Sequence, residues 1–342
     1  MIARFGLVTI FAVAMASAAV TGTVQNGTTG KPQAGAEVTL YKFGQGGMEP
    51  VAHVNTDAQG NFSFNQDAGG QGPSIVRVER DGVTYNHFMP PGSPTTGFTV
   101  TVYDASKQPG EAKVSKHMLL FQPGNGQMTI NETFVVENPA NKTWSNPAAG
   151  TIQFYLPKGA NGNVEAKATA PDGAGMSVPV PTDKAGRPDV YAAKFEIKPG
   201  QTQIDLNYTV PYTQGSPYEG KIVTKDENTY LITPAGITLT ADHLNDLGTE
   251  PRTQAHIYGL TATSYKIQLT GTEAPVATAD NGAADQADNS GPGIEQIMPK
   301  IFGQVKLILA LTLGILALGF VLLYRANPGG AVPKEPNERG RN

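Results

Sequence analysis

Two kinds of hydrophobic pattern divide this chain. From Val20 to Leu269, apolar and polar residues alternate in short runs that are separated by glycine, proline and asparagine. From Leu307 to Tyr324 the residues are apolar without interruption by charge. Alternation with a period of two is typical of half-buried strands, whereas an uncharged apolar run of about 18 residues predicts a membrane-spanning helix. The sequence therefore predicts an all-β protein with one C-terminal transmembrane α-helix.

Residues 19–104 are expected to form a first, small β-sandwich. Asp57-Ala58-Gln59-Gly60 and Asp81-Gly82 separate alternating runs, and glycine at such positions favours hairpin turns. The pattern predicts about seven strands, which is the number expected for one small sandwich. These strands are centred near Val20, Val38, Ala52, Phe62, Val76, Tyr85 and Val100.

Residues 105–271 are expected to form a second, larger immunoglobulin-like sandwich. Turn signals such as Pro123-Gly124-Asn125-Gly126 and Pro171-Asp172-Gly173 recur between alternating runs. The number of runs predicts roughly ten or more strands, which is the number expected for a large sandwich. The alternating positions are Met128, Ile130, Ile152, Phe154, Leu156, Ile204, Leu206, Tyr208, Val210, Tyr265, Ile267 and Leu269.

One set of spaced residues resembles a known family. The set comprises Val20-Thr21-Gly22-Thr23-Val24, Gly30-Lys31-Pro32, Gly35, Val38-Thr39-Leu40, Thr56-Asp57 and Gly60-Asn61-Phe62-Ser63-Phe64. It is similar to the carboxypeptidase regulatory-like family, which is close to transthyretin-like and collagen-adhesin B-type repeats. The resemblance implies a prealbumin-like sandwich in residues 19–104 and a carbohydrate-binding-like fold. It implies an accessory, adhesive or sugar-binding-like module and no particular activity, because such folds serve many unrelated proteins.

The ends of the chain predict export and membrane attachment. Arg4, an apolar run and Ala16-Ser17-Ala18 are typical of a signal peptide at residues 1–18. The Ala-, Asp- and Gly-rich stretch 272–293 predicts a flexible linker. Residues 294–306 predict an interfacial amphipathic segment, 307–324 the transmembrane helix and 325–342 a short basic cytoplasmic tail. A single-pass protein of a bacterial membrane is expected, with its β part in the periplasm or at the cell surface.

Composition and motifs argue against catalysis. Cysteine is absent, which excludes disulfides, thiolate zinc sites and thiol nucleophiles. The net charge is −4 and the basic residues are scattered, so nucleic acid is not an expected partner. No P-loop, GxSxG or HExxH motif occurs, and the histidines lack metal-ligand spacing; His53 and His87 lie in predicted strands of the same sandwich and are interpreted as ordinary strand histidines. We expect no enzyme activity, no cofactor and no metal site.

Three aromatic residues are candidate contacts for a ligand or partner. Trp144 lies in a loop-like, Asn- and Pro-rich stretch, where it is able either to stack on a sugar or to cap the open end of the sandwich. Tyr212 and Tyr218 flank Gly215 in another predicted loop and leave the same alternatives open. Ala310 and Gly314 form a small-xxx-small pair, a candidate contact between two membrane helices.

These patterns predict a membrane-anchored, non-catalytic interaction or scaffold protein with a protein partner. A carbohydrate-binding module of the cell envelope is an alternative that uses Trp144 and the two tyrosines. An accessory subunit of a membrane-bound enzyme complex is another. A row of exposed coplanar aromatic rings favours the sugar interpretation, and a contiguous apolar patch on one sheet face favours a protein partner.

Overall fold

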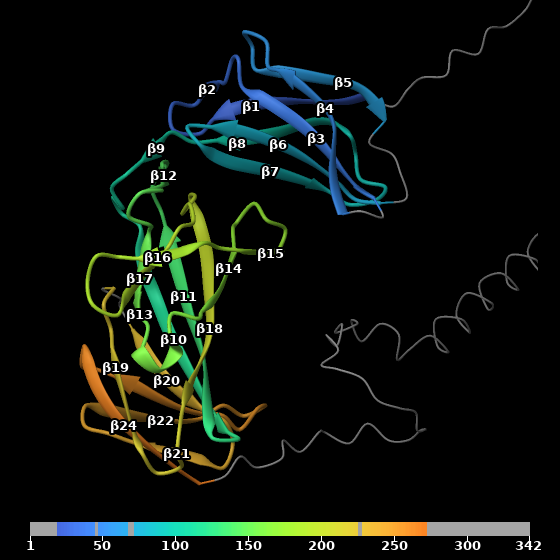
Figure 1. The fold of residues 1–342 in the computed structure, drawn as a ribbon. Coiled ribbons are helices and arrows are strands. Elements are labelled where there is room, and N and C mark those ends of the chain that lie inside the picture. The colour runs from blue at the N-terminus through green and yellow to red at the C-terminus, as the bar shows by residue number, and fades with distance from the viewer. Residues whose placement is uncertain (1–18, 45–46, 68–71, 225–227, 272–342) are drawn as a thin grey trace, which may run out of the picture. The chain divides into compact units, whose positions relative to one another are not determined.

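The computed structural model describes residues 19–44, 47–67, 72–224 and 228–271. This part of the chain contains 24 strands and one short 3-10 helix, η1 (Lys158–Ala160). The strands are drawn as arrows in Figure 1. No helix within these ranges is long and apolar enough to cross a membrane. The prediction of an all-β fold is confirmed for these residues. The predicted signal peptide, linker, interfacial segment, transmembrane helix and cytoplasmic tail, together with the candidate contacts Ala310 and Gly314, lie outside the described residues.

The first eight strands form two four-stranded sheets. In one sheet β1 is antiparallel to β5 and β2 and parallel to β8. The other sheet has the order β4-β3-β6-β7, with every neighbour antiparallel. All seven predicted strands are present, and β2 is an additional short one. Their bounds are β1 (Ala19–Asn26), β2 (Lys31–Pro32), β3 (Glu37–Gly44), β4 (Gly47–Asn55), β5 (Asn61–Asp67), β6 (Ser74–Arg80), β7 (Val83–Met89) and β8 (Thr96–Val102).

Side chains from both of these sheets meet in one hydrophobic cluster. Val20 and Phe64 come from the first sheet, and Val38 and Val78 come from the second. Each of the four is at most 1% exposed. Burying these apolar side chains between two sheets is the main favourable contribution to such a fold. We refer to β1–β8 as the N-terminal sandwich.

The remaining strands build a larger sandwich-like body around a second hydrophobic cluster. Its main sheet has eight strands in the order β15-β14-β18-β11-β10-β20-β23-β22. Two three-stranded sheets, β13-β17-β16 and β19-β24-β21, contribute to the same cluster. The strands are β9 (Ala105–Ser106), β10 (Lys113–Gly124), β11 (Gln127–Asn138), β12 (Thr143–Trp144), β13 (Ile152–Tyr155), β14 (Glu165–Thr169), β15 (Ser177–Pro179), β16 (Thr182–Lys184), β17 (Val190–Ala193), β18 (Gly200–Pro211), β19 (Pro217–Lys221), β20 (Thr229–Thr233), β21 (Ile237–Thr240), β22 (Leu244–Thr249), β23 (His256–Leu260) and β24 (Ser264–Gly271).

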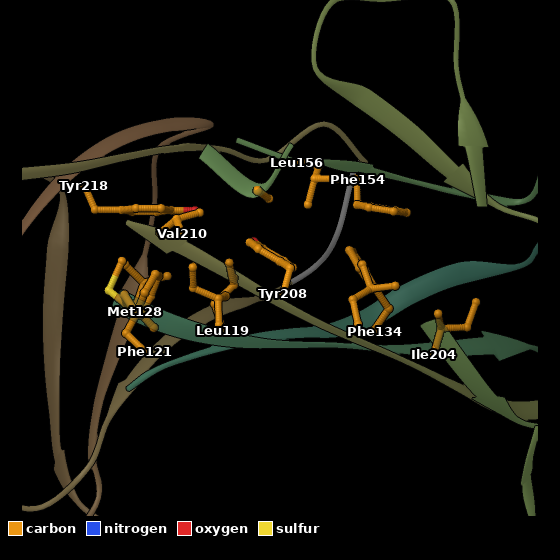
Figure 2. Close-up of a cluster of buried hydrophobic side chains, with 14 of the residues drawn as sticks. Leu119, Phe121, Met128, Phe134, Phe154, Leu156, Ile204, Tyr208, Val210 and Tyr218 are labelled. Atoms are coloured by element: carbon orange, nitrogen blue, oxygen red, sulfur yellow. The ribbon is translucent and has the colours of Figure 1, made fainter. Parts of the chain in front are cut away.

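The long strands β10, β11 and β18 supply one wall of this second cluster. Figure 2 shows Phe121, Met128 and Phe134 on that wall, with Phe154 and Tyr218 approaching from the opposite side. The predicted alternation is confirmed here, because the inward positions of β11 and β18 are buried and most of their outward neighbours are not. We refer to β10–β24 as the larger sandwich.

Two hairpins owe their tight turns to residues with positive φ. Asp81 and Gly82 join β6 to β7 with φ of 52° and 74°. Asn125 and Gly126 join β10 to β11 with φ of 52° and 75°. Left-handed conformations at both central residues match the twist of paired strands, and Asn, Asp and Gly adopt them at low cost. Each turn fixes the register of its hairpin.

Hydrogen bonds link residues of the N-terminal sandwich to residues that follow it in the chain. The backbone N–H of Asn86, in β7, donates to Oδ2 of Asp172 at 2.9 Å. The hydroxyls of Tyr85 and Thr143 lie 2.8 Å apart. All described residues belong to one compact unit by their backbone contacts.

Candidate functional site

Trp144 lies in a short strand, β12, and not in the predicted loop. Its backbone N–H donates to the carbonyl of Ile197 at 3.0 Å, and Ile197 returns a bond of 2.9 Å. The indole is half-buried and packs against the cluster of the larger sandwich. Its Nε1–H is buried and has no hydrogen-bond acceptor. This placement leaves only part of the ring at the surface.

Tyr212 and Tyr218 are both buried, at 8% and 7% exposure. Tyr218 belongs to β19, and its ring contacts Phe121 edge-on with centroids 5.4 Å apart. Tyr212 follows β18 and lines a cavity of about 360 Å³ beside the β10–β11 turn. These two rings and Trp144 do not form an exposed row.

Four polar side chains lie within the core of the larger sandwich. His117 Nε2 lies 2.7 Å from Glu132 Oε1, and the two side chains are 2% and 4% exposed. The hydroxyl of Tyr208 donates to the other carboxylate oxygen, Oε2, at 3.2 Å. The hydroxyl of Tyr218 lies near that of Tyr208, and each affects the pKa of the other. We call His117, Glu132, Tyr208 and Tyr218 the core polar network.

Burial governs the ionisation of the two phenols in this network. It raises the pKa of Tyr218 and of Tyr208 well above the usual range, and the nearby charge of Glu132 adds to the effect. Both hydroxyls therefore stay protonated and remain donors at physiological pH. Most buried polar groups are paired in this way, because an unpaired one lowers the free energy of unfolding.

The core polar network is suited to holding the fold and not to turnover. His117 and Glu132 are enclosed between sheets, so a substrate cannot reach them without separating those sheets. The ring of His117 also stacks on Phe134 with centroids 4.1 Å apart, which fixes its orientation.

Sequence reasoning missed this network, although one signal was present. Glu132 stands between Ile130 and Phe134, at an inward position of an otherwise apolar run. A charged residue on the buried face of a strand indicates an internal partner. The partner was not evident, because the register of β10 with β11 places His117 opposite Phe134, diagonally next to Glu132.

His53 and His87 lie on opposite edges of one sheet. His53 belongs to β4 and His87 to β7, and strands β3 and β6 run between them. The ring of His87 stacks on Phe98 with centroids 4.2 Å apart, and burial lowers the pKa of His87. Within the described ranges no group of three His, Cys, Asp or Glu side chains is placed to hold a metal ion.

The outward face of the sheet β4-β3-β6-β7 carries an apolar surface that sequence reasoning did not identify. In β3 the side chains of Val38 and Leu40 face the core, so Tyr41 and Phe43 follow on the other side. The outward residues form a contiguous set by strand register, in which Tyr41 pairs with Pro50 and Ile75, Ile75 with Phe88, and Phe43 with Met48.

Several members of this set remain accessible. Phe43 is 36% exposed and Met48 is 38% exposed. The guanidinium of Arg77 lies 4.5 Å from the centroid of the Tyr41 ring, and its Nε donates to Asn86 at 3.3 Å. We call this set the outer apolar patch, which consists of Tyr41, Phe43, Met48, Pro50, Ile75 and Phe88. Ile75 is itself buried at 4% exposure, so the accessible surface comes from the other five residues.

Neither the models of known protein families nor the curated protein sequences match this chain.

Proposed function

We propose that this protein is a non-catalytic interaction or scaffold protein of a bacterial membrane. The segment 307–324 anchors it, and its β part lies on the extracytoplasmic side. The outer apolar patch is the observation that carries the proposal. A sheet face in water normally presents polar residues, and contiguous exposed apolar residues are typical of a surface that binds a protein.

The proposal includes two domains, a prealbumin-like sandwich in 19–104 and an immunoglobulin-like one in 105–271. Thr56 and Asp57 are two of the residues that carry the resemblance to carboxypeptidase regulatory-like domains. Their contacts support the first of these two domains. Thr56 Oγ1 accepts from the backbone N–H of Ala36 at 2.9 Å and donates to the carbonyl of Gln33 at 2.6 Å. Asp57 Oδ1 accepts from the backbone N–H of Asn61 at 2.7 Å, which shapes the turn before β5.

Co-purification from solubilised membranes tests the interaction. The double variant Phe43→Ser/Met48→Ser removes apolar surface from exposed positions and should leave folding nearly unchanged. It is expected to lose the protein that the wild type retains. Leu247→Ser is the matched control, because Leu247 is 57% exposed in a different sheet and should keep that partner. Retention of the same partner by the double variant would contradict the proposal.

Export and anchoring need a separate test. A chain ending at Gly291 lacks the apolar segment and should be recovered, folded and soluble, from the extracytoplasmic side. The full chain should remain in the membrane fraction after washing with high salt and alkali. Recovery of the full chain in the soluble fraction would contradict the anchor.

The two other functions make different predictions. If this protein were a carbohydrate-binding module that uses Trp144, then Trp144→Phe would abolish its sugar binding. The indole is half-buried, so only a small part of the ring is accessible for stacking on a sugar. An accessory subunit would co-purify with an enzyme activity that disappears with the outer apolar patch. The patch favours a protein partner over the first of these.

A further inference from the structure

We propose that the outward face of the sheet β4-β3-β6-β7 binds a protein segment that presents a basic, an acidic and an apolar side chain in that order. This rests on the proposed function, in which the same face is the interaction surface, and it adds the chemistry of the partner. Strand register arranges the outward side chains in rows that cross the four strands. The chemical character changes from row to row, so the rows define what a partner must carry.

The first row is acidic. Glu37 and Glu79 lie directly opposite each other on β3 and β6, and Asn55 and Thr84 stand at the two ends of the row. Both glutamates are exposed, and neither carboxylate makes a hydrogen bond or an ion pair with another described residue. Like charges that face each other across two strands are destabilising. A positive group of a partner would relieve this repulsion.

The second row is basic. Arg77 on β6 and His53 on β4 lie in it, together with Thr39 and Asn86. The guanidinium is oriented by the ring of Tyr41 and by the bond from its Nε to Asn86. Its two terminal nitrogens make no hydrogen bond within the described part of the chain. Such a fork is suited to binding both oxygens of a carboxylate.

The third row is apolar and belongs to the outer apolar patch. Three of its four members are accessible, and the buried one is Ile75. A fourth row, made by Phe43 and Met48, continues the apolar surface in the same direction. The third row consists of Pro50, Tyr41, Ile75 and Phe88.

The spacing of the rows fits an extended peptide. Adjacent rows are two residues apart along β3, β6 and β7, which corresponds to about 7 Å. Alternate side chains of an extended chain have the same spacing. A segment of the type basic-x-acidic-x-apolar that lies along the strands therefore places each side chain over its complementary row. Asp172, which binds the backbone of Asn86 beside this face, is paired with Lys198 and adds no net charge.

A second copy of this chain would fit the face less well. A two-fold axis along the strands would bring each row against itself, so that Arg77 would meet Arg77. An axis across the strands would reverse the order of the rows. Pairing Arg77 with the glutamates would then leave the apolar row without an apolar counterpart. The order of the rows therefore favours a different protein as the partner.

Fluorescence anisotropy with two labelled peptides tests this order. The first peptide carries lysine, aspartate, phenylalanine and leucine in that order, each separated by threonine, with blocked ends. The second has the same composition, with lysine and aspartate exchanged. The full chain in detergent should bind the first about fivefold more tightly, because the exchange turns attraction into repulsion at two rows.

Reversing the charges of the protein should reverse this preference. The triple variant Glu37→Lys/Arg77→Glu/Glu79→Lys has a basic first row and an acidic second row, so it should prefer the second peptide. Arg77→Gln is a milder change and should bring the two affinities closer together. Glu219→Lys is the control, because the side chain of Glu219 is 70% exposed in another sheet and should leave the preference unchanged. Thermal unfolding verifies that each variant is folded.

The inference would be overturned if the wild type bound neither peptide, bound both equally, or if the triple variant kept the wild-type preference. Co-purification distinguishes this failure from a failure of the proposed function. If Arg77→Glu retains the protein that Phe43→Ser/Met48→Ser loses, the order of charges is wrong and the outer apolar patch still binds a protein. If neither variant loses that protein, the proposed function itself is contradicted.

Discussion

Lys198 and Asp172 form a nearly enclosed ion pair. The ammonium Nζ lies 2.8 Å and 2.6 Å from the two carboxylate oxygens, and the lysine side chain is only 7% exposed. The same ammonium lies 5.2 Å from the centroid of the Tyr85 ring. The pair therefore holds Asp172 in place to accept the backbone N–H of Asn86.

Removing only one member of this pair should be costly. Asp172→Ala leaves the ammonium of Lys198 enclosed without a partner, and such changes cost about 3–5 kcal/mol when burial is complete. Because Asp172 is 22% exposed, we expect the lower end of that range. The double variant Asp172→Ala/Lys198→Met should be less destabilised than Asp172→Ala alone. Urea unfolding measures both, and an Asp172→Ala variant as stable as the wild type would refute the role of the pair.

The core polar network predicts a cost for losing a single hydroxyl. Tyr208→Phe removes a donor to the carboxylate of Glu132 and should lower the free energy of unfolding by about 1–3 kcal/mol. Tyr212→Phe is the matched control, since its hydroxyl lies 3.5 Å from the carbonyl of Leu269, at the limit of a hydrogen bond. Thermal unfolding should separate the two variants. Equal melting temperatures would contradict this view of the network.

Phe64 should be a main support of the N-terminal sandwich. It is 1% exposed, and truncating a buried phenylalanine costs about 3–5 kcal/mol. Phe64→Ala should therefore strongly lower the melting temperature of residues 19–104, produced as a fragment that we expect to fold alone. Phe43→Ala, at an exposed position, should lower it little. A fragment that is unfolded without substitution would instead contradict the proposed domain boundary.

His87 should make the stability of this sandwich depend on pH. Burial lowers its pKa in the folded state below the ordinary value of 6.5. At a pH between the folded and unfolded pKa values of His87, the unfolded chain binds more protons than the folded chain. The contribution of His87 to stability is therefore complete above pH 6.5 and is lost as the pH falls through the folded pKa. His87→Phe keeps a ring against Phe98 and should reduce the decline between about pH 7 and pH 5.

The exposed His53 provides the control for this measurement. His53→Gln should leave the decline as it is in the wild type. Asp57 and Asp104 have pKa values lowered by hydrogen bonds, from Asn61 and from Asn26 respectively. Their contributions are lost only at more acidic pH, so they do not obscure the effect of His87. A decline unaffected by His87→Phe would exclude this histidine as its source.

The local alternation of apolar and polar residues predicted the strands. The positions of the candidate site residues depend instead on pairing between strands that are distant in the sequence. The alternation around Val38 or Ile204 depends on neighbouring residues, so it was evident from the sequence. Trp144 and Tyr218 lie among turn-forming residues and were expected in loops. Pairing with distant strands placed them in β12 and β19. Tertiary context overrode local propensity at both positions.

The outer apolar patch depends on strand register in the same way. Tyr41, Ile75 and Phe88 are far apart in the sequence, and only the order of β3, β6 and β7 aligns them. Such sets cannot be found before strand pairing is known.

The bond between Asn86 and Asp172 also bears on the order in which the chain is made. Asn86 lies in the edge strand β7, and its backbone N–H points away from β6. This donor is therefore available to any strand that approaches the edge. Its partner is synthesised much later, and Lys198 later still. A nascent chain that stops before Asp172 thus carries an N-terminal sandwich whose edge strand β7 has an unpaired backbone N–H at Asn86. In the complete chain Asp172 occupies this amide, so premature termination should yield fragments that associate with one another through β7.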